Sequence, residues 1–121
     1  MENQLTDREA DIMRILWGRG PSTVNEVRAA LDDTLAYTTV QTILRILEEK
    51  GFAAHEDQGR QHRFHALVAE STARRNALQH LVGKLFRGSS ELLFTQLVSD
   101  TELTPEQVRR LKRLLAGGSK E

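Results

Sequence analysis

Residues 38–51 have the sequence TTVQTILRILEEKG. Thr38 and Gln41 have the spacing of a capping box, in which side chains satisfy the free backbone groups of a helix start. Four apolar residues then follow the i, i+3, i+4, i+7 spacing of a helix with one buried stripe, namely Val40, Ile43, Leu44 and Leu47. Gly51 comes directly after Lys50 and is typical of a helix end. The stretch predicts a helix from Thr38 to Lys50.

Two shorter helices are predicted before this one, over residues 7–17 and 24–31. Each follows a Thr-x-x-Glu capping box, which begins at Thr6 in the first case and at Thr23 in the second. The first helix is stopped by the run Gly-Arg-Gly-Pro that follows it. Three helices within about fifty residues, the last two joined by a short polar turn, are typical of a helix-turn-helix unit.

The pattern changes to short strands after the third helix. Residues 52–57 and 61–67 lack helical periodicity, and the turn-forming residues 58–60, Gln-Gly-Arg, separate them. Two short strands and a turn predict a β-hairpin, which would be the wing beside the helix-turn-helix unit.

Helical periodicity returns beyond residue 70, with helices predicted over 71–85, over 91–98 and from Pro105 onward. Ser71 is placed to cap the first of them and Thr104 the last. About fifty residues lie near the lower limit for a separate hydrophobic core, so burial against a second copy explains the apolar side chains better than a self-contained bundle. The predicted dimerisation residues are Leu78, Leu81, Leu85, Phe86, Leu92, Leu93, Leu97, Leu111 and Leu114.

The composition limits the classes of function. A chain of 121 residues fits one domain, or one domain with a short accessory segment. It has no cysteine, which excludes disulfides and thiolate metal sites, and no spacing of Ser, His, Asp or Glu indicates catalysis, so we do not expect an enzyme. No apolar run approaches the roughly 18 residues of a membrane span, and a cytoplasmic protein without a membrane partner is expected.

The charge distribution does not by itself suggest nucleic acid. Basic and acidic residues number 17 each, and the first 70 residues contain 8 Lys and Arg against 12 Asp and Glu. This acidic balance favours an alternative function, a winged-helix module for protein interaction without specific DNA binding.

The polar face of the third helix has side chains that suit a DNA major groove. At 100° per residue, Thr38, Thr42 and Arg45 lie opposite the apolar stripe, and Gln41 lies at the edge of that face. Arg can pair with guanine, Gln can pair with adenine, and Thr can contact a phosphate or a thymine methyl group. An ordinary solvated helix face has the same composition, so both interpretations stay open.

Cationic and aromatic residues flank this helix. Arg60, His62 and Arg63 lie around the hairpin turn, where a wing meets the phosphate backbone, although a solvated turn would also contain them. Tyr37 can donate its hydroxyl to a phosphate or pack beneath the helix start.

Three histidines at the hairpin raise the question of a metal. Strand alternation places His62 and His65 on opposite faces, and no carboxylate shows ligand spacing with these two or with His55. We therefore expect no metal site and no cofactor.

The residues resemble the penicillinase-repressor (BlaI/MecI/CopY) family of winged-helix transcriptional regulators over nearly the whole chain. The segments that carry the resemblance are Leu5-Thr6 with Glu9, Ile15-Leu16-Trp17, Tyr37 to Leu44, Leu47 to Phe52, Gly59-Arg60, Leu85 to Ser89 and Leu103 to Glu106. The resemblance implies an amino-terminal winged helix that binds operator DNA and carboxy-terminal helices that dimerise. It places Thr39, Thr42 and Arg60 at DNA-contacting positions and makes Gln41 and Arg45 the residues that set sequence choice. On the helical wheel Thr39 lies nearer the buried edge, so its hydroxyl is expected to serve the helix start and a phosphate rather than a base.

Three features depart from this family pattern. Many relatives have a basic residue at the position of Ile46, and the cysteine site of the copper-responsive members is absent. Members controlled by antibiotic-sensing proteases resemble one another around an Asn-Phe cleavage point, where this chain has Gln96-Leu97. The resemblance therefore allows an upstream sensor protease as a partner, without a matching cleavage sequence.

The predicted fold is mainly α: a winged helix-turn-helix with three helices and a β-hairpin wing, followed by a helical dimerisation segment. The expected regions are a DNA-binding domain over residues 1–70, a dimerisation region over 71–116 and a disordered tail over 117–121. The expected function is that of a homodimeric, sequence-specific transcriptional repressor on a palindromic promoter operator of double-stranded DNA.

Overall fold

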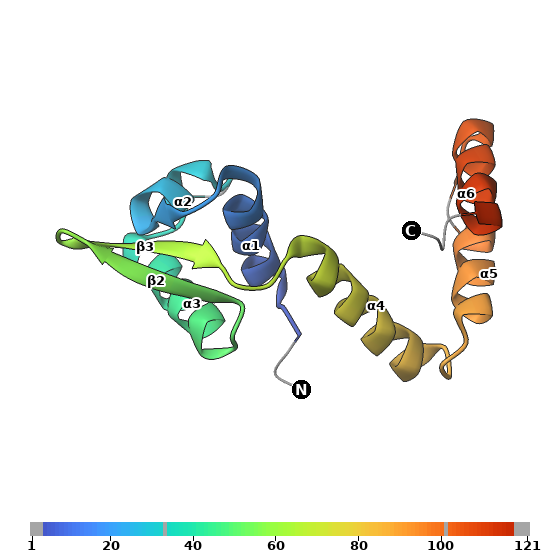
Figure 1. Ribbon diagram of the computed structural model, residues 1–121, viewed down its shortest axis with the longest axis horizontal. Coiled ribbons are helices and arrows are strands. Elements are labelled where there is room, and N and C mark those ends of the chain that lie inside the picture. The colour runs from blue at the N-terminus through green and yellow to red at the C-terminus, as the bar shows by residue number, and fades with distance from the viewer. Residues whose placement is uncertain (1–3, 33, 101, 118–121) are drawn as a thin grey trace. The chain divides into compact units, whose positions relative to one another are not determined.

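The computed structural model describes residues 4–32, 34–100 and 102–117 (Figure 1). The chain comprises two compact units, of which the first ends at Ala77 and the second begins at Leu78. The first unit has the predicted winged-helix fold. It also includes the first turns of α4 (Glu70–Leu85), where Ala73 packs against the core.

Three helices and a three-stranded antiparallel sheet make up most of the first unit. The helices are α1 (Asp7–Arg19), α2 (Val24–Ala30) and α3 (Tyr37–Glu49), and the strands are β1 (Ser22–Thr23), β2 (Ala53–Gln58) and β3 (Gln61–Ala66). The strand order is β1-β3-β2. Strands β2 and β3 form the predicted hairpin, whose turn holds Gly59 at a φ of 66°, a left-handed conformation that favours glycine.

The sequence pattern did not indicate strand β1. Its two residues leave no room for an alternating pattern, and only their pairing with β3 identifies them as a strand, with Ser22 opposite Phe64 and Thr23 opposite Arg63. Long-range pairing therefore determines this element.

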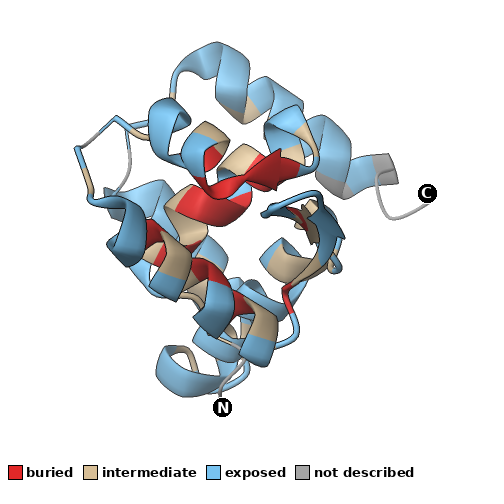
Figure 2. Cartoon of the chain, turned by 90° about the vertical axis from the view of Figure 1, so that its left-hand side faces the viewer, coloured by how far each residue is buried: buried red, intermediate tan, exposed pale blue. Residues whose placement is uncertain are grey.

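The hydrophobic core lies between the three helices and the sheet (Figure 2). Its buried apolar side chains are Ile12, Met13, Leu16, Val24, Val27, Val40, Leu44, Leu47, Phe52, Ala53 and Phe64. At its edge, the Trp17 Nε1 donates to the Val68 carbonyl oxygen over 2.8 Å and ties α1 to the segment before α4. Three of the four predicted stripe residues of the third helix are thus fully buried, which fixes the direction of its polar face.

Two of the predicted capping boxes are confirmed and one is wrong. Thr6 with Glu9 and Thr23 with Glu26 make both reciprocal hydrogen bonds. The box at Thr38 does not form, because α3 begins one residue earlier with Ala36 as its N-cap and no side-chain cap bond. Thr38 therefore lies inside the first helical turn.

The second unit contains the end of α4 together with α5 (Ser90–Asp100) and α6 (Pro105–Gly117). Helix α4 begins at Glu70, so the predicted cap at Ser71 is wrong, whereas Thr104 and Gln107 form reciprocal bonds at the start of α6. Gly117 is the last residue of α6, and the rest of the predicted disordered tail, 118–121, lies outside the described residues. Within the described part of the chain, no helix is long and apolar enough to cross a membrane.

Candidate nucleic-acid interface

The polar face of α3 is exposed along its amino-terminal half. Thr38, Thr42 and Arg45 are exposed as predicted, and Gln41 is half-buried at the edge of the face. Thr39, which was expected nearer the buried edge, is also exposed. The face therefore presents three hydroxyls, one amide and one guanidinium to solvent.

The carboxy-terminal end of α3 is joined to α1 by an ion pair between half-buried Lys50 and buried Glu9. Lys50 Nζ donates to Glu9 Oε1 over 2.7 Å and to the Gln4 carbonyl oxygen over 2.9 Å. Burial alone would raise the pKa of the Glu9 carboxyl, but hydrogen bonds from Lys50 and from the Thr6 backbone hold that pKa below its ordinary value. The pair thus fixes the end of α3 against the start of α1.

The wing is held against α2 by Arg63. Its Nη1 lies 3.0 Å from Glu26 Oε1 and 3.1 Å from the Pro21 carbonyl oxygen, and its Nε donates to Gln58 over 2.7 Å. A backbone hydrogen bond from Thr23, followed by the charges of nearby arginines, lowers the pKa of Glu26. The guanidinium of Arg63 is therefore occupied by contacts within the protein, which distinguishes it from Arg60.

Arg60 and Tyr37 lie at the two ends of the predicted interface. Arg60 follows Gly59 in the hairpin turn and is exposed, and no ion pair of Arg60 occurs among the residues that the structure describes. Tyr37 is the first residue of α3 and is 41% exposed. Both side chains are accessible to a polyanion, and the two alternatives for the Tyr37 hydroxyl stay open.

The inner face of the wing brings together residues that sequence spacing kept apart. His62 and His65 lie on opposite faces of β3 as predicted, but the register pairs Asp57 directly with His62, and His55 precedes Asp57 by two residues on β2. One ligand atom from each of His55, Asp57 and His62 lies within 4.8 Å of the others. The prediction that no carboxylate has ligand spacing with these histidines was therefore wrong, because cross-strand neighbours depend on the register.

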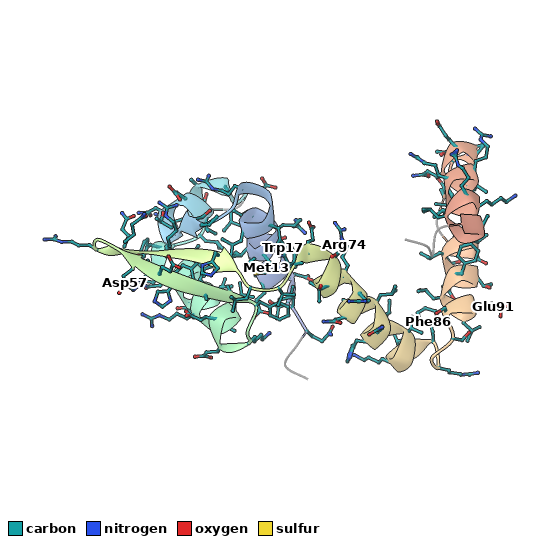
Figure 3. All side chains as sticks on the ribbon, viewed as in Figure 1. Met13, Trp17, Asp57, Arg74, Phe86 and Glu91 are labelled. Atoms are coloured by element: carbon teal, nitrogen blue, oxygen red, sulfur yellow. The ribbon has the colours of Figure 1, made fainter. Side chains whose placement is uncertain are left out.

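Side-chain positions show how these groups are distributed (Figure 3). Asp57 projects from the wing, whereas Met13 and Trp17 belong to α1 on the core side.

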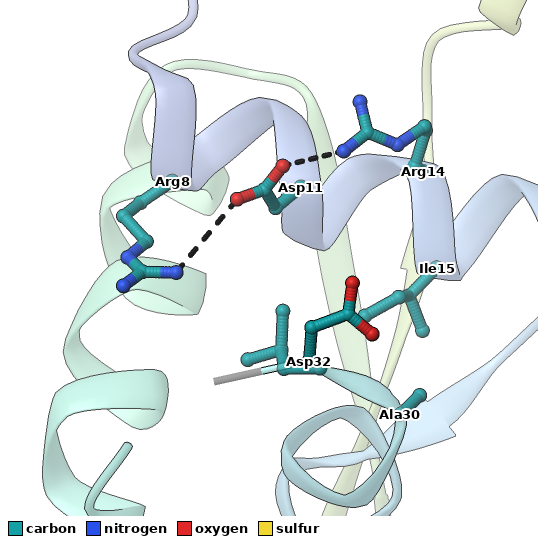
Figure 4. Close-up of a pocket in the computed structure, with 7 residues that line it drawn as sticks. Arg8, Asp11, Arg14, Ile15, Ala30 and Asp32 are labelled. Atoms are coloured by element: carbon teal, nitrogen blue, oxygen red, sulfur yellow. Dashed lines mark hydrogen bonds and ion pairs between the residues drawn. The ribbon is translucent and has the colours of Figure 1, made fainter. Parts of the chain in front are cut away.

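A separate hollow between α1 and α2 is lined by Arg8, Asp11, Arg14, Ile15, Ala30, Leu31 and Asp32 (Figure 4). There Asp11 pairs with Arg14 at 2.5 Å and Arg8 at 3.8 Å. This lining offers no nucleophile beside a base, so it has no catalytic arrangement.

Comparison with known proteins identifies the family. The family model described as penicillinase repressor matches residues 5–117. The penicillinase repressor of Bacillus licheniformis is 24% identical over 93% of this chain and 89% of its own, and the methicillin resistance regulatory protein MecI of Staphylococcus aureus strain N315 is 19% identical over 93% of both chains. An ArsR-like transcriptional regulator from Rhodococcus sp. RHA1 aligns with a TM-score of 0.48 at 14% identity, over 80% of this chain and 86% of that one. The chain belongs to the penicillinase repressor family, whose members are transcriptional repressors and not enzymes.

Proposed function

We propose that this protein is a homodimeric transcriptional repressor that binds a palindromic promoter operator through α3 and the wing. The observation that carries this proposal is the polar face of α3, which is exposed while Val40, Leu44 and Leu47 on the opposite side are fully buried. An exposed, rigidly seated helix of this kind can enter the major groove of B-DNA.

The residues of the face divide by the contacts that their chemistry allows. Arg45 pairs with a guanine edge and Gln41 with adenine, which makes these two the determinants of sequence choice. The threonines are suited to phosphate oxygens or to a thymine methyl group, namely Thr38, Thr39 and Thr42. The Tyr37 hydroxyl is suited to a phosphate oxygen. These contacts set the register of the helix in the groove. Arg60 and His62 extend the phosphate contacts to the wing.

The homodimer is supported by the apolar surface of the second unit. Helices α4 and α5, all of whose residues the structure describes, contain no buried residue. Large apolar side chains are exposed on α4, α5 and α6 in the single chain, namely Leu78, Leu81, Leu85, Leu92, Phe94, Leu97, Val98 and Leu114. A second copy would cover this surface, and a twofold dimer would supply the two reading helices that a palindrome needs.

Cleavage by a sensor protease would act on this same region. The bond between Gln96 and Leu97 lies inside α5, and the Leu97 side chain is 47% exposed. A cut there would divide α5 and remove α6 from the proposed dimer surface. Loss of the dimer would then release the operator.

A salt titration of DNA binding tests the proposal. The purified full chain is titrated against the promoter region upstream of its own gene, with scrambled DNA of equal length as competitor. We expect a promoter-to-scrambled affinity ratio above about a thousandfold, and a logarithmic salt slope that counts the phosphate contacts. A ratio near one on this promoter and on other genomic fragments would instead support the protein-interaction module, which the acidic balance of the first 70 residues favours.

A further inference from the structure

The inner face of the wing contains a compact cluster of one carboxylate and two imidazoles. His55 and Asp57 lie two residues apart on β2, so they share a face, and Asp57 is the cross-strand partner of His62. The two imidazole centroids are 4.4 Å apart, and His62 Nδ1 lies 2.8 Å from Asp57 Oδ1. The hairpin register therefore places three side chains that can ligate a metal around one point.

A second carboxylate orients the first imidazole from outside the cluster. Both carboxylate oxygens of Glu48, on α3, lie within 3.0 Å of His55 Nδ1, the shorter distance being 2.8 Å. The tautomer that carries its proton on Nδ1 can donate to Glu48 and keeps a lone pair on Nε2, which lies 4.0 Å from Asp57 Oδ1. Metal-bound histidines are commonly oriented in this way, by a carboxylate on the nitrogen that does not bind the metal.

The charge of the cluster and the ability of its exposed side chains to rotate favour a divalent cation. Two carboxylates face two imidazoles, and within the described part of the chain no Lys or Arg pairs with Asp57 or Glu48. The side chains of Asp57 and His62 are 77% and 46% exposed, so they can rotate to close the gap. Donors that stand about 2.0–2.2 Å from a tetrahedral zinc ion lie roughly 3.4 Å from one another. Metal binding would therefore shorten the 4.0 Å distance from His55 Nε2 to Asp57 Oδ1 and lengthen the 2.8 Å distance from His62 Nδ1 to Asp57 Oδ1.

We propose that His55 Nε2, the Asp57 carboxylate and the His62 imidazole bind a divalent transition-metal ion of the zinc class, with water at the open position. Two nitrogens and one oxygen are donors that zinc accepts, whereas calcium and magnesium prefer oxygen ligands alone. The bound ion bridges β2 and β3 and, through Glu48, links the wing to α3. That this link changes DNA affinity rests on the proposed function, but the site itself does not.

Isothermal titration of the chelator-treated, untagged full chain with Zn²⁺ alone tests the site. We expect one ion per chain for the wild type, and a loss of affinity of at least tenfold for His62→Gln and for His55→Gln. Glu48→Gln is expected to weaken binding by about 10–100-fold, because it removes the orienting carboxylate. The exposed side chain of His62 makes that variant safe for folding, which circular dichroism verifies.

His65→Gln is the matched control, because His65 is on the same strand but faces away from the cluster. It is expected to bind zinc like the wild type. Absence of one-to-one binding by the wild type, or an equal loss in His65→Gln and His62→Gln, would overturn the site and indicate general surface binding. Neither result depends on DNA, so the proposed function would stand unaffected.

Discussion

Arg45 is the single residue on which sequence choice is expected to depend most. It is exposed on α3, and no ion pair of Arg45 occurs among the described residues, so its guanidinium is available to a base edge. Arg45→Ala should cost about 1–3 kcal/mol of specific binding and relax the preference at one base pair. Competition binding with operator variants measures both effects. Arg75→Ala, at an exposed position on α4, should leave the ratio of operator affinity to scrambled-DNA affinity unchanged. An equal loss on operator and scrambled DNA would assign Arg45 to a phosphate.

The ion pair of Glu9 and Lys50 makes stability depend on pH at one residue. The pKa of Glu9 in the folded chain is below its ordinary 4.5, so the stabilisation is complete above that value and is lost as the pH falls through the folded pKa. Glu9→Gln should therefore lower the free energy of unfolding at pH 7 by about 1–3 kcal/mol. This difference from the wild type should shrink as the pH is lowered from 5 to 3, because Glu9 then becomes protonated in the wild type as well.

Urea unfolding at several pH values measures this difference. Glu49→Gln is the control, because Glu49 is an exposed carboxylate on α3. It should change stability little at any of these pH values. A deficit of Glu9→Gln that stays constant down to pH 3 would show that lost packing, and not the ion pair, causes the destabilisation.

At the scale of elements, local patterns predicted the helices and long-range pairing determined the rest. The capping boxes at Thr6 and Thr23 predicted the starts of α1 and α2 correctly, because a capping box is complete within four residues. The same pattern at Thr38 was misleading, since α3 starts earlier and uses Ala36 as its N-cap. Strand β1 and the meeting of Asp57 with His62 could not be predicted, because both follow from the register of β3 with its neighbours.

The polar face of α3 could be predicted because an apolar stripe fixes its opposite side. Val40, Leu44 and Leu47 have the spacing that only a helix buries together, and the structure buries all three completely. The contact of the Arg63 guanidinium with another residue of the protein could not be predicted in the same way. Its partner Glu26 lies on α2, 37 residues away in sequence.

The wing should therefore use its two arginines differently. Arg60 is exposed in the turn, whereas Arg63 binds Glu26 and Gln58 within the protein. Arg60→Ala should weaken binding equally on all sequences and reduce the logarithmic salt slope by about 1. Arg63→Ala should leave the slope unchanged and increase amide hydrogen exchange in β3, because it releases the wing from α2. A drop in slope for both variants would place Arg63 on the phosphate backbone as well.

At the scale of the whole molecule, the second unit leaves large apolar side chains exposed in the single chain, and the proposed dimer would cover them. Leu85 is 67% exposed on α4 and Leu114 is 63% exposed on α6, although both are large apolar side chains. Full burial of one such side chain stabilises by about 1.5–3 kcal/mol, and a twofold interface contains each residue twice. The excess of apolar residues could be predicted from the sequence, but the surface that the proposed second copy would use to cover them could not, because it belongs to another chain.

Leu85→Glu should therefore separate dimerisation from folding. The charge would have to be buried in both halves of the interface, so the dimer dissociation constant should rise by at least about a hundredfold, which corresponds to 2.7 kcal/mol at 1.36 kcal/mol per tenfold. Sedimentation equilibrium measures that constant. Operator affinity should also fall, because the two copies of α3 in a dimer bind the two half-sites together, whereas separate monomers bind each half-site independently.

Leu67→Glu is the matched control for this variant. Leu67 is 57% exposed in the first unit, between β3 and α4, and lies outside the proposed dimer surface. It should keep the dissociation constant and the operator affinity of the wild type. If both variants dimerise normally, the apolar surface of the second unit has another occupant. If Leu85→Glu is monomeric but binds the operator at full strength, one copy of α3 and the wing suffices, and the operator need not be palindromic.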